Sequence, residues 1–389
     1  MRTAIAAAGC AVGLLLAGCS DAPSEPDSEG SPPPTVTSSP SASTATASTL
    51  PTASPEELGF DSEVLERLAR EAEDAGSTCL LVARDGVVAG EWYWNAGAPD
   101  KPQEVFSVTK SVTSTLVGLA QAEGDLALGD RAASYIPEWK GTPSRSVTVR
   151  NLLSNDSGRF WSPESDYQAL LQAPDRTSYA VGLEQAARPG TVWAYNNAAI
   201  QTLDRVIRNA TGTATEAYAQ ERLFGPLGMT STRMTLDASK KSTQAFFGMQ
   251  STCPDLARFG QLFEQQGEWE GDQLLPTDWV QDAVGRSSQQ LNAAYGLLWW
   301  VNRKGTQRLP VDDRNPGLPP GVSGVGQLVP GAPASMYAAL GFGGQVVLVD
   351  PGSGTVVVRL GTLGTGSTPG ADPYTFADAA NVVTEALTG

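Results

Sequence analysis

Histidine is absent from this 389-residue sequence, and cysteine occurs only four times. Without an imidazole the chain can build neither a Ser-His-Asp triad nor a Cys-His pair, and it can offer no histidine to zinc. Cys10 and Cys19 lie in an N-terminal targeting segment, which leaves Cys79 and Cys253, too few for a four-cysteine zinc site. We therefore expect no metal and no cofactor. A hydrolase built on this chain must take its base from lysine, tyrosine or a carboxylate.

Basic residues are also scarce. The 26 Lys and Arg residues stand against 42 Asp and Glu, which gives a net charge of −16. Nucleic acids are bound by basic faces, and no basic stripe appears in the sequence. The composition therefore argues against a nucleic-acid partner, while 41% hydrophobic residues over this length are enough to bury a large core.

The N-terminus has the pattern of a bacterial export signal. Met1-Arg2 provides a positive start, and the apolar run 4–17 is too short to cross a bilayer as a helix. The run ends in Leu16-Ala17-Gly18-Cys19, which resembles a lipobox. Residues 1–19 are predicted to be a lipoprotein signal peptide, with Cys19 lipidated and the protein membrane-anchored on the extracytoplasmic side of a bacterial cell. An ordinary cleaved signal with an incidental cysteine is the alternative.

Residues 20–55 are rich in Ser, Thr and Pro and show no apolar periodicity. Such a segment cannot bury enough apolar surface to offset the entropy lost on ordering. We interpret it as a disordered tether, and residues 56–389 as the folded domain.

Hydrophobic periodicity in residues 56–389 predicts an α+β domain. Asp85-Gly86 between two apolar runs indicates a hairpin, and Gly124 ends an apolar helical pattern that begins at Ser107. The predicted helices are 62–75, 107–123 and 373–387, the predicted strands are 79–83, 87–94, 335–340, 345–349 and 355–360, and 126–290 is helix-rich. Strands at both ends indicate one antiparallel sheet built from both termini, flanked by helices, with an inserted helical lobe.

A Ser-x-x-Lys sequence, Ser107-Val108-Thr109-Lys110, opens the second predicted helix. Positions i and i+3 share a helix face with Cβ atoms about 5–6 Å apart, so that the lysine amine can reach the serine hydroxyl. The free N–H groups at the helix start favour negative charge on the serine oxygen. Ser107 is therefore the candidate nucleophile and Lys110 its candidate base, although so short a motif also arises by chance.

Tyr195-Asn196-Asn197, after Pro189-Gly190, is the second candidate. A phenol can carry a proton when a nearby cation lowers its pKa from about 10, and the Asn197 amide can donate to a substrate carbonyl. Tyr93-Trp94-Asn95 repeats the pattern, but it lies in a predicted strand before the Ser-x-x-Lys sequence.

Together these segments resemble the serine β-lactamase and penicillin-binding-protein superfamily, in particular its class C-like branch of esterases and 6-aminohexanoate-dimer hydrolases. The resemblance covers about residues 56–389 and rests on ordered landmarks at 106–112, 124–137, 147–158, 189–197, 226–229, 255–260 and 341–345. It implies a β-lactamase/transpeptidase-like fold. It also implies an acyl-enzyme on Ser107, with Lys110 and Tyr195 together accepting and returning the proton.

The resemblance further implies that Asn197 orients Lys110 and the substrate. The oxyanion would be held by the backbone N–H groups of Ser107 and of Phe342, beside Gly341. For Lys110 to act as a base near neutral pH, burial must lower its pKa by about 2–3 units.

The sequence departs from the family at the third motif. Where relatives have Lys-Thr-Gly or His-x-Gly, this chain has Ala339-Leu340-Gly341, without a cation. The missing cation disfavours substrates with the carboxylate of penicillins and favours a small ester or amide. The alternatives are a penicillin-recognising D,D-peptidase or β-lactamase, which would take a peptide-like substrate, and a non-catalytic binding lipoprotein on the same fold.

Two sets of residues leave a choice at this point. Cys79 and Cys253 either form a disulfide, as the oxidising extracytoplasmic compartment favours, or stay as two buried thiols. Trp299-Trp300 either pack in the core or line a pocket, and the loop with Trp161 and Tyr167 either covers the site or is a plain surface loop.

Overall fold

The computed structural model describes residues 50–285, 290–310, 323–362 and 374–388. The predicted signal peptide, with Cys19, and residues 20–49 of the predicted tether lie outside these ranges. Within them, no helix is both long enough and apolar enough to span a bilayer.

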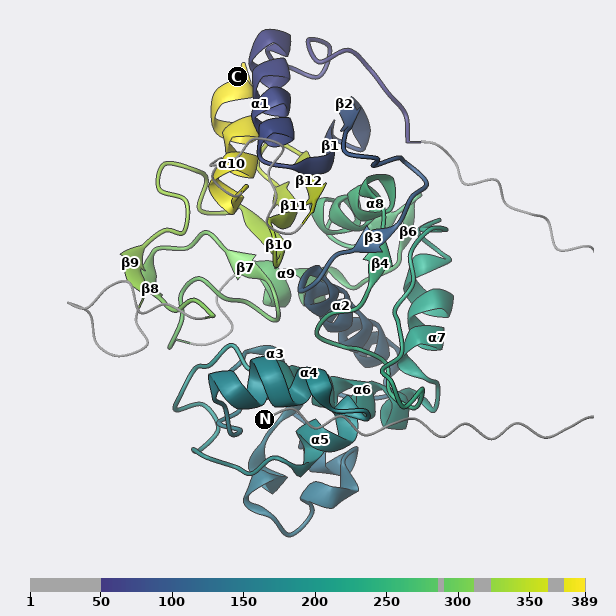
Figure 1. The fold of residues 1–389 in the computed structure, drawn as a ribbon, viewed down its shortest axis with the longest axis vertical. Coiled ribbons are helices and arrows are strands. Elements are labelled where there is room, and N and C mark those ends of the chain that lie inside the picture. The colour runs from purple at the N-terminus through teal and green to yellow at the C-terminus, as the bar shows by residue number, and fades with distance from the viewer. Residues whose placement is uncertain (1–49, 286–289, 311–322, 363–373, 389) are drawn as a thin grey trace, which may run out of the picture. The chain divides into compact units, whose positions relative to one another are not determined.

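A six-stranded antiparallel sheet is the centre of the folded part (Figure 1), in the order β2-β1-β12-β11-β10-β7. Its strands are β1 (Ser77–Arg84), β2 (Val87–Tyr93), β7 (Trp300–Val301), β10 (Tyr337–Gly341), β11 (Gln345–Asp350) and β12 (Thr355–Gly361). Leu81 of β1 lies opposite Val358 of β12, so both ends of the chain build one sheet, which confirms the predicted α+β class. The two-residue edge strand β7 was not predicted.

Side chains that alternate along the strands separate two cores. Leu80 and Val82 pack with α1 (Ser62–Asp74) and α10 (Phe376–Asn381), whereas Leu81 and Ala83 pack with α2 (Val108–Glu123) and α8 (Cys253–Glu264). This is the period-two pattern of a strand buried on both faces. Figure 1 shows α1 and α10 beside each other next to the sheet, near the marked C-terminus. The predicted last helix starts later than expected, at Phe376, and continues as a π-helical turn, Val382–Ala386.

The helical lobe lies between α2 and α8 in the chain and packs on α2 through α6. Its helices are α3 (Val149–Leu153), α4 (Leu170–Gln172), α5 (Arg176–Gly182), α6 (Asn197–Thr211) and α7 (Thr215–Ala219); α9 (Thr277–Val284) follows α8. Short strand pairs are β3 (Gln103–Glu104) with β4 (Gln250–Ser251), β5 (Glu268–Trp269) with β6 (Asp272–Gln273), and β8 (Gly305–Gln307) with β9 (Gly324–Gly326).

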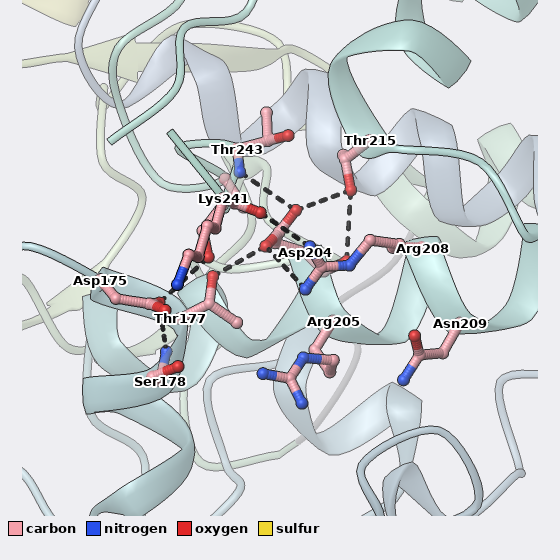
Figure 2. Close-up of polar contacts among 12 residues, drawn as sticks. Asp175, Thr177, Ser178, Asp204, Arg205, Arg208, Asn209, Thr215, Lys241 and Thr243 are labelled. Carbon is pink, nitrogen blue, oxygen red and sulfur yellow. Dashed lines mark hydrogen bonds and ion pairs between the residues drawn. The ribbon is translucent and has the colours of Figure 1, made fainter. Parts of the chain in front are cut away.

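Asp204, buried on α6, ties the lobe together (Figure 2). Its carboxylate accepts hydrogen bonds from the hydroxyls of Thr177 at 2.8 Å and Thr215 at 2.9 Å, and from the backbone N–H of Thr243 at 3.3 Å. Arg208, one turn along the helix, lies 3.9 Å away. Because these partners come from α5, α7 and the segment before β4, the cluster fixes that segment against α6.

The start of the folded domain needs a correction. The tether was predicted to reach residue 55, but Pro51 accepts a hydrogen bond from Val88 N–H, and Ala53 N–H donates to the Val88 carbonyl. β2 is an edge strand with unpaired backbone groups, and such an edge accepts an additional extended segment. Composition misses this pairing because it is made by the backbone.

Cys79 of β1 and Cys253 of α8 are joined in a disulfide, with their Cα atoms 6.5 Å apart. The bond links the sheet to the first turn of the helix that covers it.

Candidate active site

Ser107 occupies the residue that precedes the first turn of α2. The preceding Phe106 has a positive φ of 48°, a conformation that costs energy for a bulky side chain. The Glu104 carboxylate holds this turn, because it accepts hydrogen bonds from Phe106 N–H at 3.1 Å and from Gly248 N–H at 2.8 Å. The strained turn thus presents the Ser107 hydroxyl at the N-terminus of a buried helix.

Lys110, one helical turn further, is 1% exposed. Its Nζ lies 2.7 Å from Ser107 Oγ and donates to the Phe246 carbonyl at 2.8 Å. Burial lowers the pKa of the amine from 10.5 to about 7, while the charge of Asp166 opposes the shift. A large share of the amine is therefore neutral near pH 7 and able to take the serine proton.

The ring centroid of Tyr195 lies 4.8 Å from Lys110 Nζ. A cation was expected to lower the pKa of this phenol; instead, burial raises it, and the interaction with Ser107 opposes the rise only in part. The expectation failed because the neighbouring amine, itself desolvated, is no longer a permanent cation. The resting phenol is therefore neutral near pH 7.

Asn197 is the first residue of α6 and is 4% exposed. Its Nδ2 donates to Asp166 at 2.8 Å, while its Oδ1 is buried and has no hydrogen-bond partner among the described residues. Asp166 and Tyr167 lie in a π-helical turn, Ser165–Ala169.

A cavity of about 540 Å³ is lined by Ser107 and by the polar side chains of Tyr167, Tyr195 and Asn197. The apolar side chains that line it include Trp300, Leu309, Leu328, Val329, Leu340 and Phe376. Neither lysine nor arginine is found among the described lining residues. The described part of the lining is therefore uncharged.

Gly341 and Phe342 form the edge of the cavity nearest β10. A Cβ at Gly341 would lie 2.3 Å from the Val105 carbonyl, so only glycine lets this strand end approach the nucleophile turn. Phe342 is 71% exposed and packs edge-on against Phe106. Ala339, at the position of the missing family cation, is buried in the core instead.

Of the aromatic residues for which a core position and a pocket position were both open, some lie in the core and others line the cavity. Trp299 is fully buried and stacks on Phe259 in the core, whereas its neighbour Trp300 lines the cavity and stacks on Tyr195. Tyr167 lines the same cavity, but Trp161 borders a different and smaller one.

Three contributors to this site were not predicted from the sequence: Glu104, Asp166 and the Phe246 carbonyl. A single acidic residue outside a motif has no spacing that marks it, and a backbone carbonyl has no signal in the sequence. Within the described ranges no three His, Cys, Asp or Glu side chains gather as a metal site requires.

This chain is similar to proteins of a known family. A family model described as Beta-lactamase matches residues 65–381. A Beta-lactamase of Pseudomonas fluorescens is 26% identical over 186 residues, which cover 44% of this chain and 50% of that protein. A 6-aminohexanoate-dimer hydrolase of Paenarthrobacter ureafaciens is 23% identical over 329 residues, 76% of this chain and 75% of that protein.

The chain spans about half the length of several curated relatives that it matches. The solved structure of a family VIII carboxylesterase has the same fold, with a TM-score of 0.59 at 14% identity, over 83% of this chain and 95% of that one.

Proposed function

The chain belongs to the β-lactamase family, and from this membership and the site geometry we propose that it is a serine hydrolase that works through an acyl-enzyme on Ser107. The observation that supports this most directly is the 2.7 Å approach of a buried amine with a pKa of about 7 to the Ser107 hydroxyl. An amine of that pKa is suited to general base catalysis near neutral pH.

In the proposed mechanism Ser107 Oγ attacks the substrate carbonyl carbon while its proton moves to Lys110 Nζ. The oxygen that becomes negative lies between the backbone N–H groups of Ser107 and Phe342, at the strand end that Gly341 keeps close. The proton then passes by way of Tyr195 to the leaving group, and the new ester on Ser107 is hydrolysed by water. Asn197 orients the amine and the substrate.

The proposed substrate is a small ester or amide without a carboxylate near the reacting bond. Support comes from the apolar side chains that line the cavity and from the lack of Lys and Arg among its described lining residues. Among the similar proteins are a 6-aminohexanoate-dimer hydrolase and a carboxylesterase, whose names describe amide and ester substrates.

Intact-mass labelling tests the proposal. A fluorophosphonate should add one phosphonyl group to the full-length chain and none to Ser107→Ala, and short-chain nitrophenyl esters or a linear amide should be hydrolysed. Equal labelling of both proteins would refute the assignment of Ser107. Acylation by a penicillin or hydrolysis of nitrocefin would instead favour the penicillin-recognising alternative. The similarity to a Beta-lactamase of Pseudomonas fluorescens supports that alternative.

We also propose that the mature protein is an extracytoplasmic lipoprotein anchored through Cys19, because the sequence 16–19 resembles a lipobox. In a bacterial host, labelled palmitate should enter the wild type and not Cys19→Ala, and the variant should leave the membrane fraction. Incorporation of palmitate into Cys19→Ala would contradict this assignment.

A further inference from the structure

Asp166 is a buried carboxylate that belongs to neither sequence motif. It is 1% exposed and lies in the π-helical turn Ser165–Ala169, a local distortion that recurs at functional sites. One carboxylate oxygen accepts a hydrogen bond from Ala198 N–H at 2.9 Å. The other accepts from Asn197 N–H at 3.0 Å and from the Asn197 side chain at 2.8 Å.

This arrangement fits an ionised group. Both oxygens of Asp166 receive backbone N–H groups from the first turn of α6, where the helix dipole favours a negative charge. A protonated carboxyl would direct its hydrogen against one of these donors. Burial raises the pKa of Asp166, and the hydrogen bonds together with the charge of Lys110 oppose the rise.

The carboxylate also determines how the Asn197 amide is oriented. An ionised carboxylate only accepts hydrogen bonds, so Nδ2 of Asn197 must face Asp166 and Oδ1 must face away from it. Oδ1 is buried without a partner among the described residues. Asp166 therefore fixes the orientation of the Asn197 amide, which lines the same cavity as Ser107.

Asp166 is, among the described residues, the one charged group whose field shifts the pKa of Lys110. The titratable neighbours of Asp166 are otherwise the phenols of Tyr167, Tyr179 and Tyr195, and the pKa of each lies above its ordinary value. None of these phenols ionises between pH 5 and 9. In that pH range the charge of Asp166 therefore affects the ionisation of the Lys110 amine.

We propose that Asp166 is a positioning residue for the reaction: it holds the Asn197 amide in one orientation and provides the negative charge that favours the ammonium form of Lys110. As the Ser107 hydroxyl proton moves to Lys110 Nζ and the oxygen bonds to the substrate carbonyl carbon, a positive charge forms inside the protein. Asp166 partly balances that charge without touching the substrate. The inference rests on the proposed function of Ser107 and Lys110.

The test is the pH dependence of inactivation by a fluorophosphonate, followed by intact mass on the full-length chain from pH 5 to 9. The wild-type rate should rise with pH along a limb set by Lys110. In Asp166→Asn the limb should move to lower pH by about half a unit or more, because loss of the negative charge disfavours the ammonium. The plateau rate should also fall about tenfold, because the Asn197 amide is no longer held in one orientation by Asp166.

Asp204→Asn is the matched control. Asp204 is equally buried, accepts hydrogen bonds from three threonines and lies on the same helix α6, but its charge does not act on Lys110 (Figure 2). This variant should lose stability and keep the wild-type limb. A second variant, Asn197→Ala, leaves the Asp166 carboxylate in place; its plateau should fall while its limb stays.

Three results would overturn the proposal: an Asp166→Asn profile that superimposes on the wild type, an equal shift in Asp204→Asn, or a shift in Asn197→Ala that matches the one in Asp166→Asn. If Asp166→Asn does not fold, Asn197→Ala still tests the proposal against the wild type, because a shift of its limb would contradict the assignment of the charge effect to Asp166. Failure of the wild type to be labelled would instead refute the proposed function.

Discussion

At the scale of one residue, burial makes the Lys110 amine a base near neutral pH and lowers the stability of the folded protein. The amine is buried with a pKa of about 7 in place of 10.5. That difference corresponds to about 4 kcal/mol of folding free energy given up at neutral pH. The hydrogen bonds to Ser107 and to the Phe246 carbonyl position the amine in return.

Lys110→Met should therefore abolish labelling of Ser107 and stabilise the protein. We expect a gain of about 2–3 kcal/mol at pH 7, less than the full cost of burial because the Phe246 carbonyl loses its donor. The unfolded wild type binds a proton that the folded state does not hold between pH 7 and 10.5, so wild-type stability rises with pH in this window. Urea unfolding at pH 7 and pH 9.5 should show the gain shrinking at the higher pH; a constant or growing gap would contradict the prediction.

Sequence alone could pair Ser107 with Lys110 because their relation is local, one turn of a helix. The family resemblance was needed to add Tyr195, which comes from a distant segment. The Phe246 carbonyl and Asp166 could not be predicted, because the contacts that place them depend on how the lobe packs against α2. The pKa of Tyr195 was misjudged for the same reason, since burial outweighs the nearby amine.

At the scale of the elements, the disulfide joins β1 to α8 over a sequence separation of 174 residues. Closing so long a loop restricts the unfolded chain, and in the chain-entropy model it is worth about 4–5 kcal/mol.

Replacing both cysteines, Cys79→Ala with Cys253→Ala, should lower the free energy of unfolding by about 3–5 kcal/mol, measured by urea denaturation of the oxidised protein. Reduction of the wild type should cause a similar loss, and reductant should not affect the double variant. Two free thiols per denatured, non-reduced wild-type chain would rule out the bond.

Strands rich in Val and Leu were predictable, since β1, β2, β10, β11 and β12 are five residues or longer with clear turns between them. β7 and the pair β3–β4 have two residues each, too few to show a period. The pairing of residues 51–53 with Val88 was missed because it uses backbone groups of a polar segment.

At the scale of the whole described domain, three parts of the chain meet at the site. The start of α2 provides Ser107 and Lys110, the inserted lobe provides Tyr195 and Asn197, and the end of β10 provides Gly341. Neither local pattern nor composition could show that these parts meet. These parts meet because both ends of the chain build one sheet, while the lobe inserted between them packs on α2 through α6.

We propose that a buried amine with a pKa of about 7 activates Ser107. The most direct test is the rate at which a fluorophosphonate modifies Ser107, measured against pH in the wild type and in Lys110→Met. In the wild type the rate should rise with pH through a midpoint near 7, and in the variant it should fall by several orders of magnitude. A wild-type rate that is flat from pH 5 to 9, or a variant that reacts as fast as the wild type, would contradict it.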